Sequence, residues 1–137
     1  MQIIVFRLKD LYFGISTEFV EEITNTFSYT PVPKSKNWIH GLINLRGDVL
    51  TLVNMYNLLN LDDFSIDDCY NNTIVAQLSE NNIALMVDEV IGVSDVNEED
   101  FHLASEEDND SVHYLVNVYD KIINILDLKN LFEEKEE

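Results

Sequence analysis

Apolar residues recur along the chain in short runs of four to seven positions, separated by polar pairs rich in Asp, Asn, Gly and Lys. Runs of this length that contain mainly Val, Ile, Leu and aromatic residues are typical of β-strands, and the polar pairs are typical of hairpin turns. The pattern predicts strands at residues 3–8, 11–15, 42–45, 49–53, 73–78, 83–87, 90–96, 112–118 and 122–126. It predicts turns at residues 9–10, 46–48, 81–82 and 120–121.

Helical spacing of apolar residues is limited to three short segments. They follow Thr17, Asn54 and Asp127, each of which is a residue type that favours a helix N-terminus. Closely spaced strands joined by helices of only one or two turns favour small β-barrels over a sandwich or a doubly wound sheet. We therefore expect an all-β fold with a few short helices.

A chain of 137 residues with 46% hydrophobic content is large enough to bury a core without covalent staples. Its single cysteine, Cys69, permits no internal disulfide. The first apolar run is interrupted by Arg7, Lys9 and Asp10 before it reaches the length of a signal-peptide core or a membrane span. These features predict a cytoplasmic protein.

The net charge of −18 is unevenly distributed along the chain. Residues 1–61 carry as many basic as acidic side chains, so the whole excess lies in residues 62–137. Such an acidic surface repels phosphate backbones and anionic lipids, which argues against nucleic-acid and direct membrane binding. Acidic excess commonly serves solubility; the alternative is that the acidic segment 95–110 steers a basic partner.

The sequence contains no residue constellation typical of catalysis. His40, His102 and His113 are scattered, and none has the short spacing to a cysteine, histidine or nucleophilic serine that a zinc site or a triad requires. The Asp67-Asp68 pair before Cys69 should raise the thiol pKa, which disfavours a nucleophilic role. We expect a protein that is not an enzyme and needs no cofactor or metal.

Five sequence blocks, taken in order, carry a family resemblance. They are Tyr-Phe-Gly-Ile at 12–15 with Val-Glu-Glu-Ile at 20–23, Thr-Pro-Val-Pro at 30–33, Ile-His-Gly-Leu-Ile-Asn-Leu-Arg-Gly at 39–47, Met-Val-Asp-Glu-Val at 86–90, and Ile-Leu-Asp-Leu-Lys-Asn-Leu-Phe at 125–132. Together they closely resemble the CheW family, adaptor proteins that couple bacterial chemoreceptors to the histidine kinase CheA. The resemblance implies two five-stranded SH3-like barrels that share a hydrophobic core.

The same resemblance sets the expected domain limits. Residues 1–132 would form one CheW-like domain, residues 133–137 an acidic tail, and the changeover between barrels would fall at about residues 55–72, where the chain can cross between them. The start at Met1 and the charged end of the chain lead us to expect a stand-alone protein. The alternatives are a CheW-like scaffold of a non-flagellar pathway, such as a pilus or developmental one, and a detached kinase regulatory domain.

The resemblance also implies two partners. One is the helical cytoplasmic tip of a methyl-accepting chemoreceptor, expected in the groove where the barrels meet; the other is the regulatory domain of a CheA-type kinase, which has the same fold. The residues that correspond to the receptor-binding face are Val20, Glu22, Gly41, Asn44 and Arg46. Those that correspond to the kinase-binding face are Ile74, Val90 and Val93. The adaptor would be recruited from the cytoplasm to membrane-associated receptor arrays.

Two of these residues have alternative structural roles. The Arg46 guanidinium can brace a turn by bonding loop carbonyls or Asp48, or it can contact the receptor, and the two roles are compatible. Gly41 can be required for its backbone angles or because a side chain there would block a partner.

The chain departs from the usual family pattern at two positions. Asn54 stands where an aspartate is usual, and it can still cap the following helix. Asn117 stands where a glycine is usual, and asparagine is the residue best able to replace glycine at positive φ. Both changes are compatible with the expected fold.

Overall fold

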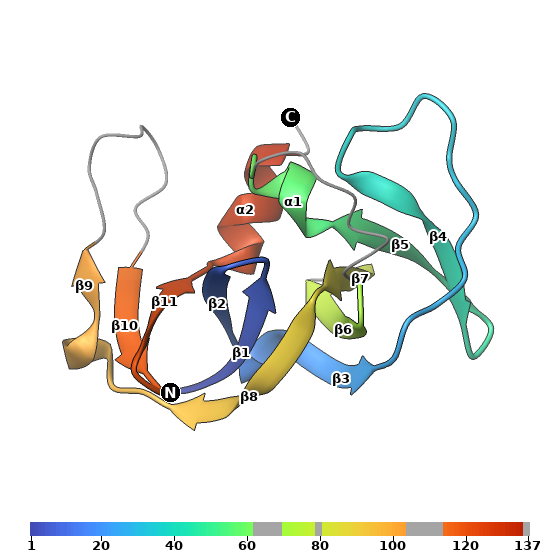
Figure 1. Cartoon of the computed structure of the whole chain (residues 1–137). Helices are drawn as coiled ribbons and strands as arrows, with labels where there is room; N and C mark the ends of the chain where they lie inside the picture. Colours follow the sequence, from blue (N-terminus) through green and yellow to red (C-terminus); the bar gives the residue numbers. More distant parts are fainter. Residues whose placement is uncertain (62–69, 79–80, 104–113, 136–137) are drawn as a thin grey trace. The chain divides into compact units, whose positions relative to one another are not determined.

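The protein, a computed structural model in which residues 1–61, 70–78, 81–103 and 114–135 are described, consists mainly of β-strands (Figure 1). The chain forms two compact units, one made of residues 1–18 and 90–137 and the other of residues 19–89. The chain therefore leaves the first unit after Glu18 and returns to it after Glu89. The described residues between 55 and 72, where the sequence analysis placed the changeover, all belong to the second unit.

The first unit contains a six-stranded sheet with the order β8-β1-β2-β11-β10-β9. Its strands are β1 (Gln2–Leu8), β2 (Leu11–Ser16), β8 (Glu89–Asp95), β9 (His102–Leu103), β10 (Tyr114–Val118) and β11 (Lys121–Ile125). The pairs β1–β2 and β10–β11 are antiparallel hairpins, and β11 runs parallel to β2. The sheet has one strand more than expected, because the two-residue β9 pairs with β10.

The first unit has a buried apolar cluster, and Ile4, Phe6, Leu8, Phe13 and Ile15 of β1 and β2 are buried as well. The buried cluster consists of Ile3, Val5, Val96, Val116, Ile123 and Ile125. The strands are followed by helix α2 (Leu128–Lys135), which buries Leu128 and Phe132 at the i, i+4 spacing of one helix face. The Asp127 carboxylate accepts a hydrogen bond from the Asn130 amide at 3.3 Å, so the predicted helix start is confirmed.

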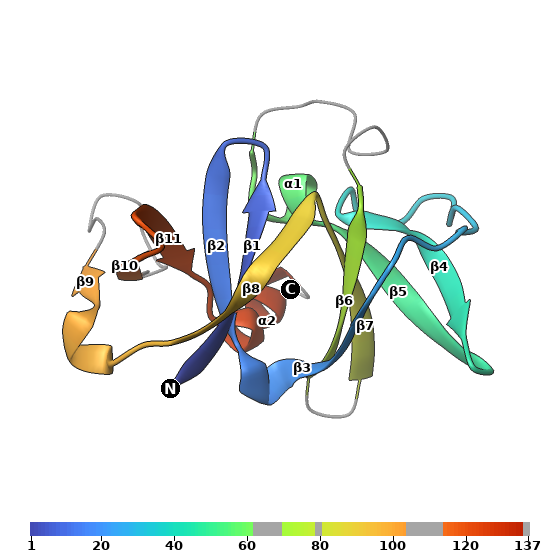
Figure 2. The same cartoon turned by 60° about the horizontal axis from the view of Figure 1, so that its bottom comes forward.

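The second unit contains a five-stranded sheet with the order β3-β6-β7-β5-β4. Its strands are β3 (Val20–Thr24), β4 (Ile39–Leu45), β5 (Asp48–Asn54), β6 (Asn72–Leu78) and β7 (Asn81–Val87). Figure 2 shows β4 and β5 running together to a shared hairpin tip, with β6 and β7 paired beside them. The predicted all-β fold with a few short helices is confirmed, and all nine predicted strands are present.

Helix α1 (Met55–Leu58) begins where the sequence predicts it. The Asn54 side chain accepts a hydrogen bond from the Asn57 amide at 3.2 Å, as an aspartate at this position would. Met55, Tyr56 and Leu58 are buried, so this single turn is held by packing rather than by its own helical stability.

The prediction of a helix after Thr17 was largely wrong. Only a single 3-10 turn, η1 (Thr17–Phe19), forms there, and Val20 to Thr24 form strand β3. Burial along β3 alternates with a period of two, and the strand pairs with β6 through a bulge between Val20 and Glu22. The apolar residues at 19, 20 and 23 suit a helix locally, but pairing with β6 decides the outcome.

Three smaller expectations also need correction. Asn81 and Asn82 lie in β7, paired with Leu78 and Gln77, rather than in a turn. Asn117 lies in β10 opposite Ile122 and is not among the positive-φ residues, so it does not replace a glycine conformation. Helix α2 extends to Lys135, so the expected tail from residue 133 is partly helical.

Some features singled out from the sequence lie outside the described residues, namely Cys69, His113 and the part of the acidic segment from residue 104 onwards. Within the described parts of the chain, no helix has both the length and the apolar character needed to span a membrane.

Candidate functional site

The β4–β5 hairpin carries three of the five residues expected at the receptor-binding face. Leu45 pairs with Asp48, so Arg46 and Gly47 form a two-residue turn, and both have positive φ, at 51° and 90°. Positive φ at both central residues defines the type I′ turn, whose twist matches that of paired strands. The Asn44 carboxamide oxygen accepts a hydrogen bond from the Gly47 amide at 3.1 Å, so Asn44 stabilises the turn that presents Arg46.

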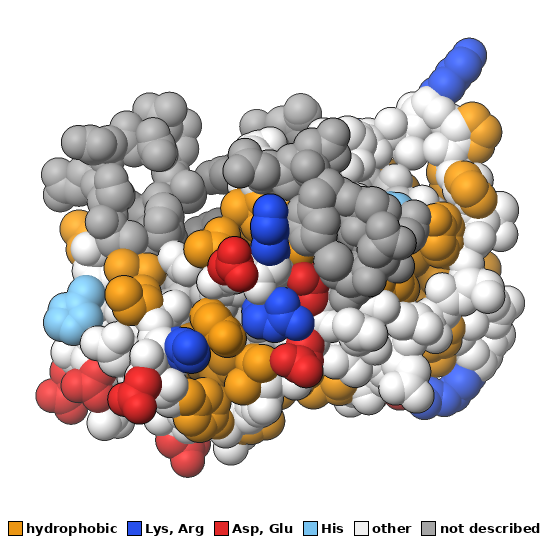
Figure 3. All heavy atoms as spheres, viewed as in Figure 1, with side chains coloured by type: hydrophobic (Ala, Val, Ile, Leu, Met, Phe, Trp, Pro, Cys, Tyr) orange, Lys and Arg blue, Asp and Glu red, His pale blue; other side chains and the backbone are white. Residues whose placement is uncertain are grey.

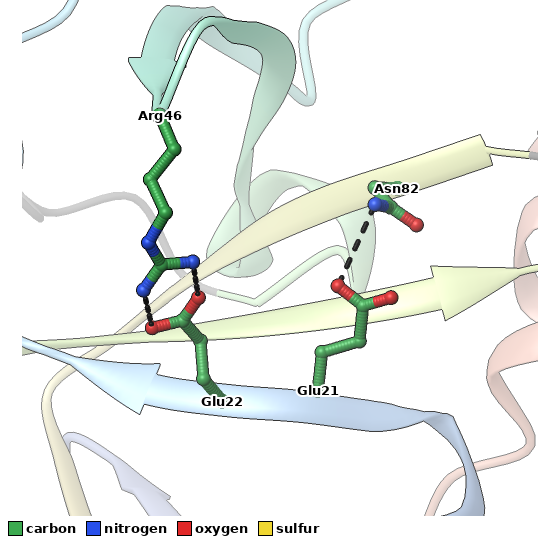
Figure 4. Close-up of polar contacts among 4 residues, drawn as sticks. All are labelled: Glu21, Glu22, Arg46 and Asn82. Atoms are coloured by element: carbon green, nitrogen blue, oxygen red, sulfur yellow. Dashed lines mark hydrogen bonds and ion pairs between the residues drawn. The ribbon is translucent and has the colours of Figure 1, made fainter.

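Arg46 makes a two-pronged ion pair with Glu22 of β3. Its two terminal nitrogens donate to Glu22 Oε1 at 2.6 Å and to Oε2 at 2.8 Å, and Figure 4 shows the guanidinium and the carboxylate facing each other along these two contacts. Strands β3 and β4 lie at opposite ends of the sheet order. The pair therefore links the two edges of the sheet, and the turn-bracing partner is Glu22 rather than Asp48.

The ion pair lies at the protein surface. The Arg46 side chain is 71% exposed and that of Glu22 28% exposed, so solvent screens their attraction. The hydrogen bonds from Arg46 lower the pKa of Glu22, against the opposing effect of partial burial, and the charge of Arg46 lowers it further. The Glu22 hydrogen bonds in turn raise the pKa of Arg46. Both groups are therefore charged at neutral pH, and the two hydrogen bonds orient the guanidinium toward β3.

Neighbouring acids on β3 have different surroundings. Glu21, which is exposed, points toward Asn82 of β7 at 3.5 Å, whereas Glu22 points toward Arg46 (Figure 4). Val20 is half-buried and pairs with Ala76 of β6. Four of the expected receptor-binding residues, on β3 and the β4–β5 hairpin, thus have side chains that reach the surface at least in part.

Gly41, the fifth expected receptor-binding residue, is buried. A Cβ at this position would lie 2.8 Å from both the Thr30 carbonyl oxygen and Tyr29 Cδ2. The close approach is part of a short antiparallel bridge in which Thr30 and Leu42 exchange two backbone hydrogen bonds of 2.9 Å. Glycine is therefore required at position 41 for steric reasons, because a side chain there would prevent the backbone of residues 29–30 from packing against the outer edge of β4.

Two exposed apolar side chains on this hairpin and one on β3 were not singled out from the sequence. Val49 is 65% exposed, and Leu42 and Ile23 are also exposed. Val49 lies opposite Asn44 in the hairpin ladder, beside the turn that carries Arg46. Apolar side chains around a fixed charge are typical of a protein-binding surface. These exposed apolar residues could have been found from the sequence, because the outward positions of strands 42–45 and 49–53 include the apolar Leu42 and Val49.

The expected kinase-binding residues fall into two groups. Ile74 in β6 is fully buried, between Ile23 and Leu85 in the sheet, so its side chain is part of the core and offers no surface to a partner. Val90 is half-buried and Val93 is 48% exposed, both on β8, an edge strand of the first unit. Ile91, which the sequence analysis did not select, is exposed on the same strand.

Acidic and apolar side chains lie near each other on the first unit. Figure 3 shows acidic side chains at the lower left, where Figure 1 places the turn before β9, with hydrophobic side chains beside them over β8. The acidic turn is η3 (Glu98–Asp100), which consists of Glu98, Glu99 and Asp100. Within the described ranges, no three His, Cys, Asp or Glu side chains are grouped as ligands for a metal ion.

Comparison with known proteins places this arrangement in a family. A family model described as CheW-like domain matches residues 2–136. The chemotaxis protein CheW of Thermotoga maritima is 27% identical, over 97% of this chain and 88% of its own length. The chemotaxis protein CheW of Bacillus subtilis is 28% identical, over 98% of this chain and 88% of its own length.

A solved structure has the same fold. The crystal structure of the scaffolding protein TtCheW from Thermoanaerobacter tengcongensis superposes with a TM-score of 0.82 and 25% identity, over 96% of this chain and 92% of that one. The hairpin with its Arg-Gly turn and the family match over residues 2–136 agree with the resemblance read from the sequence. The chain belongs to the CheW-like domain family of chemotaxis proteins.

Proposed function

We propose that this protein is a non-catalytic adaptor that couples bacterial chemoreceptors to a CheA-type histidine kinase in chemotaxis. The observation that carries the proposal is the family match over residues 2–136. The described fold supports it, since the surface features are exposed apolar side chains and a fixed ion pair. An adaptor needs such contact surfaces, because its function depends on binding alone.

The receptor-binding face is the surface formed by β3 and the β4–β5 hairpin. Glu22 holds the Arg46 guanidinium in one orientation, and Asn44 fixes the turn from which it projects. A pre-oriented guanidinium loses little conformational entropy when it binds carboxylates or carbonyls of a partner, which favours affinity. The partner at this face is the helical cytoplasmic tip of a methyl-accepting chemoreceptor.

The kinase-binding face is the exposed part of β8. Val93 and Ile91 project from this edge strand and Val90 is half-buried, so the strand presents a short apolar surface. The partner there is the regulatory domain of the kinase. Ile74 contributes to the core and is replaced in this assignment by Ile91. With both faces occupied, the adaptor is recruited from the cytoplasm to membrane-associated receptor arrays.

The proposal is tested by reconstitution from purified parts. A receptor cytoplasmic fragment displayed on vesicles, the cognate kinase and this protein are mixed, and the kinase that sediments with the vesicles is measured. We expect much more kinase to sediment when the adaptor is present. Arg46→Ala should reduce sedimentation of the adaptor itself, and Val93→Asp should leave the adaptor bound but reduce sedimentation of the kinase.

Two outcomes would contradict the proposal. If the same amount of kinase sediments with and without the protein, it is not a coupling adaptor. If the protein binds neither the receptor fragment nor the kinase, both proposed faces are wrong. A pull-down from the native cell extract, with the retained receptors and kinases identified, would then name the pathway that the protein serves.

A further inference from the structure

The two units of the protein share one strand order. Beginning at an edge, the first five of the six strands in the first unit have the order β8-β1-β2-β11-β10, and the five strands of the second unit have the order β3-β6-β7-β5-β4. Each contains an antiparallel hairpin (β1–β2, β6–β7), then a parallel pair (β11 with β2, β5 with β7), then a second antiparallel hairpin (β10–β11, β4–β5). The β10–β11 turn therefore corresponds to the β4–β5 turn that carries Arg46, and edge strand β8 corresponds to β3.

The corresponding turns have the same backbone geometry. Val118 pairs with Lys121, so Tyr119 and Asp120 form a two-residue turn in which both φ angles are positive, at 54° and 60°. Arg46 and Gly47 form the matching turn with φ angles of 51° and 90°. Tyr119 is thus the positional counterpart of Arg46, although the two side chains differ completely in chemistry.

Tyr119 also contacts an edge strand. Tyr119 contacts β8, and Arg46 contacts β3, which is the corresponding strand of the second unit. The Tyr119 hydroxyl donates a hydrogen bond of 3.0 Å to the backbone carbonyl of Val93 in β8. The hydroxyl also passes close to the neighbouring Gly92, where a Cβ would lie in ordinary van der Waals contact, 3.4 Å from the hydroxyl oxygen. In each unit, therefore, the first residue of a type I′ turn is bonded to the edge strand at the far side of the sheet order.

The bonded strand is the one assigned to kinase binding. An edge strand has a ladder partner on one side only, so its backbone is less restrained than that of a central strand. The Tyr119 bond adds a restraint at Val93, whose side chain is exposed together with that of Ile91. Restraining a binding strand before the partner arrives lowers the entropy cost of association.

We propose that Tyr119 is a positioning residue for kinase binding: its hydroxyl holds β8 at Val93 so that Val93 and Ile91 are presented to the kinase regulatory domain. This inference rests on the proposed function. It assigns to the first unit a counterpart of the Arg46–Glu22 bond in the second, with a neutral hydrogen bond in place of an ion pair. The contact is therefore insensitive to salt, unlike a surface ion pair.

The test uses Tyr119→Phe in the full chain, because this change removes only the hydroxyl. Binding to the purified regulatory domain of the cognate kinase is measured by titration calorimetry, and backbone exchange in β8 by hydrogen–deuterium exchange. We expect exchange in β8 to accelerate and the Kd to rise by up to about tenfold, because the partner must then order a strand that the hydroxyl no longer restrains, and the net value of one hydrogen bond sets the upper limit. Affinity for the receptor fragment should stay as in the wild type, and the thermal midpoint should fall by no more than the few degrees that the loss of one surface hydrogen bond costs.

Tyr114→Phe is the matched control, since Tyr114 is a similarly exposed tyrosine on β10, 42% against 52% for Tyr119. We expect it to bind the kinase domain as the wild type does. A wild-type Kd for Tyr119→Phe, or an equal loss in both variants, would overturn the positioning role. A parallel fall in thermal midpoint and in both affinities would also overturn it, because that pattern indicates a general structural loss.

Val93→Asp separates this inference from the proposed function. If Val93→Asp abolishes kinase binding while Tyr119→Phe has no effect, the kinase-binding face is correct and Tyr119 is not part of its positioning. If Val93→Asp binds like the wild type, the assignment of β8 fails, and the inference fails with it. If the wild type itself does not bind the kinase domain, the proposed function is wrong.

Discussion

Tyr56 and Asp88 form a buried hydrogen-bonded pair that joins helix α1 to the end of β7. The Tyr56 hydroxyl oxygen lies 3.0 Å from Asp88 Oδ1 and 2.8 Å from Oδ2, and the two residues are only 3% and 2% exposed. A buried carboxylate is tolerated when hydrogen bonds replace its lost hydration. Asp88 is the aspartate of the Met-Val-Asp-Glu-Val block at 86–90. Its role in that block is therefore structural, because it accepts the Tyr56 hydrogen bond in the core.

Tyr56→Phe should therefore destabilise the fold. The variant keeps the ring but removes one donor from a buried carboxylate, and we expect the free energy of unfolding to fall by about 1–3 kcal/mol. Urea unfolding followed by circular dichroism measures this change. Tyr114→Phe at an exposed position should shift it by less than about 0.5 kcal/mol. Equal stability of Tyr56→Phe and the wild type would show that the bond contributes nothing.

The ion pair between Arg46 and Glu22 predicts a non-additive effect on receptor binding. Arg46→Ala should raise the Kd for the receptor fragment at least about tenfold while leaving the circular dichroism spectrum unchanged. Glu22→Gln should have a smaller effect, because it only loosens the guanidinium. The double variant should bind no worse than Arg46→Ala alone, since Glu22 acts through Arg46.

Glu21→Gln serves as the control for this cycle. Glu21 is the adjacent acid on β3 but points toward Asn82 instead of Arg46 (Figure 4). It should bind the receptor fragment as the wild type does. If Arg46→Ala binds as tightly as the wild type but unfolds at lower urea, Arg46 only braces the sheet edges and is not a receptor contact.

The same pair predicts a pH dependence of stability. Hydrogen bonds from Arg46 lower the pKa of Glu22 below its ordinary value of about 4.3. A carboxylate with a lower pKa in the folded state contributes stability above its unfolded pKa, and loses it as the pH falls through the folded pKa. The stability difference between the wild type and Glu22→Gln should thus be constant from pH 7 to about pH 5 and shrink between about pH 5 and pH 2. Urea unfolding across this range measures it; a difference that persists unchanged at the acid end would contradict the assigned pKa shift.

Most strands of the fold can be predicted from the sequence because their pattern is local. Ile123 lies between the exposed Ile122 and the polar Asn124, whereas residues 3–6 form a continuous buried apolar run, and turn residues bound both segments. Strand β3 was missed because its apolar positions also fit a helix, and only pairing with β6 distinguishes the two structures. Strand β9 has two residues, too few for any periodic pattern.

The candidate site could be predicted only in part. The Arg46-Gly47 turn follows from residue types, and the family resemblance marked Arg46 and Glu22 as members of one face. Their ion pair joins residues 24 positions apart on opposite edges of a sheet, and no local pattern encodes such a contact. Ile74 was expected at a binding face but is buried. In a strand of apolar residues, the sequence alone does not distinguish the side chains that fill the core from those that reach the surface.

Gly41 leads to a prediction that separates steric from conformational roles of glycine. Gly41→Ala would place a methyl group 2.8 Å from the Thr30 carbonyl oxygen, so the backbone of residues 29–30 must move and the Thr30–Leu42 bridge must weaken. We expect the free energy of unfolding to fall by about 1–3 kcal/mol, as for other overpacked sites, and exchange of the Leu42 amide proton to accelerate. Gly47→Ala is the contrasting control: it has open space around the new methyl group but a φ of +90°, so it should cost about 1–2 kcal/mol without altering Leu42 exchange. Hydrogen exchange by NMR distinguishes the two variants, and unchanged protection of Leu42 in Gly41→Ala would show that the segment at Thr30 accommodates a side chain.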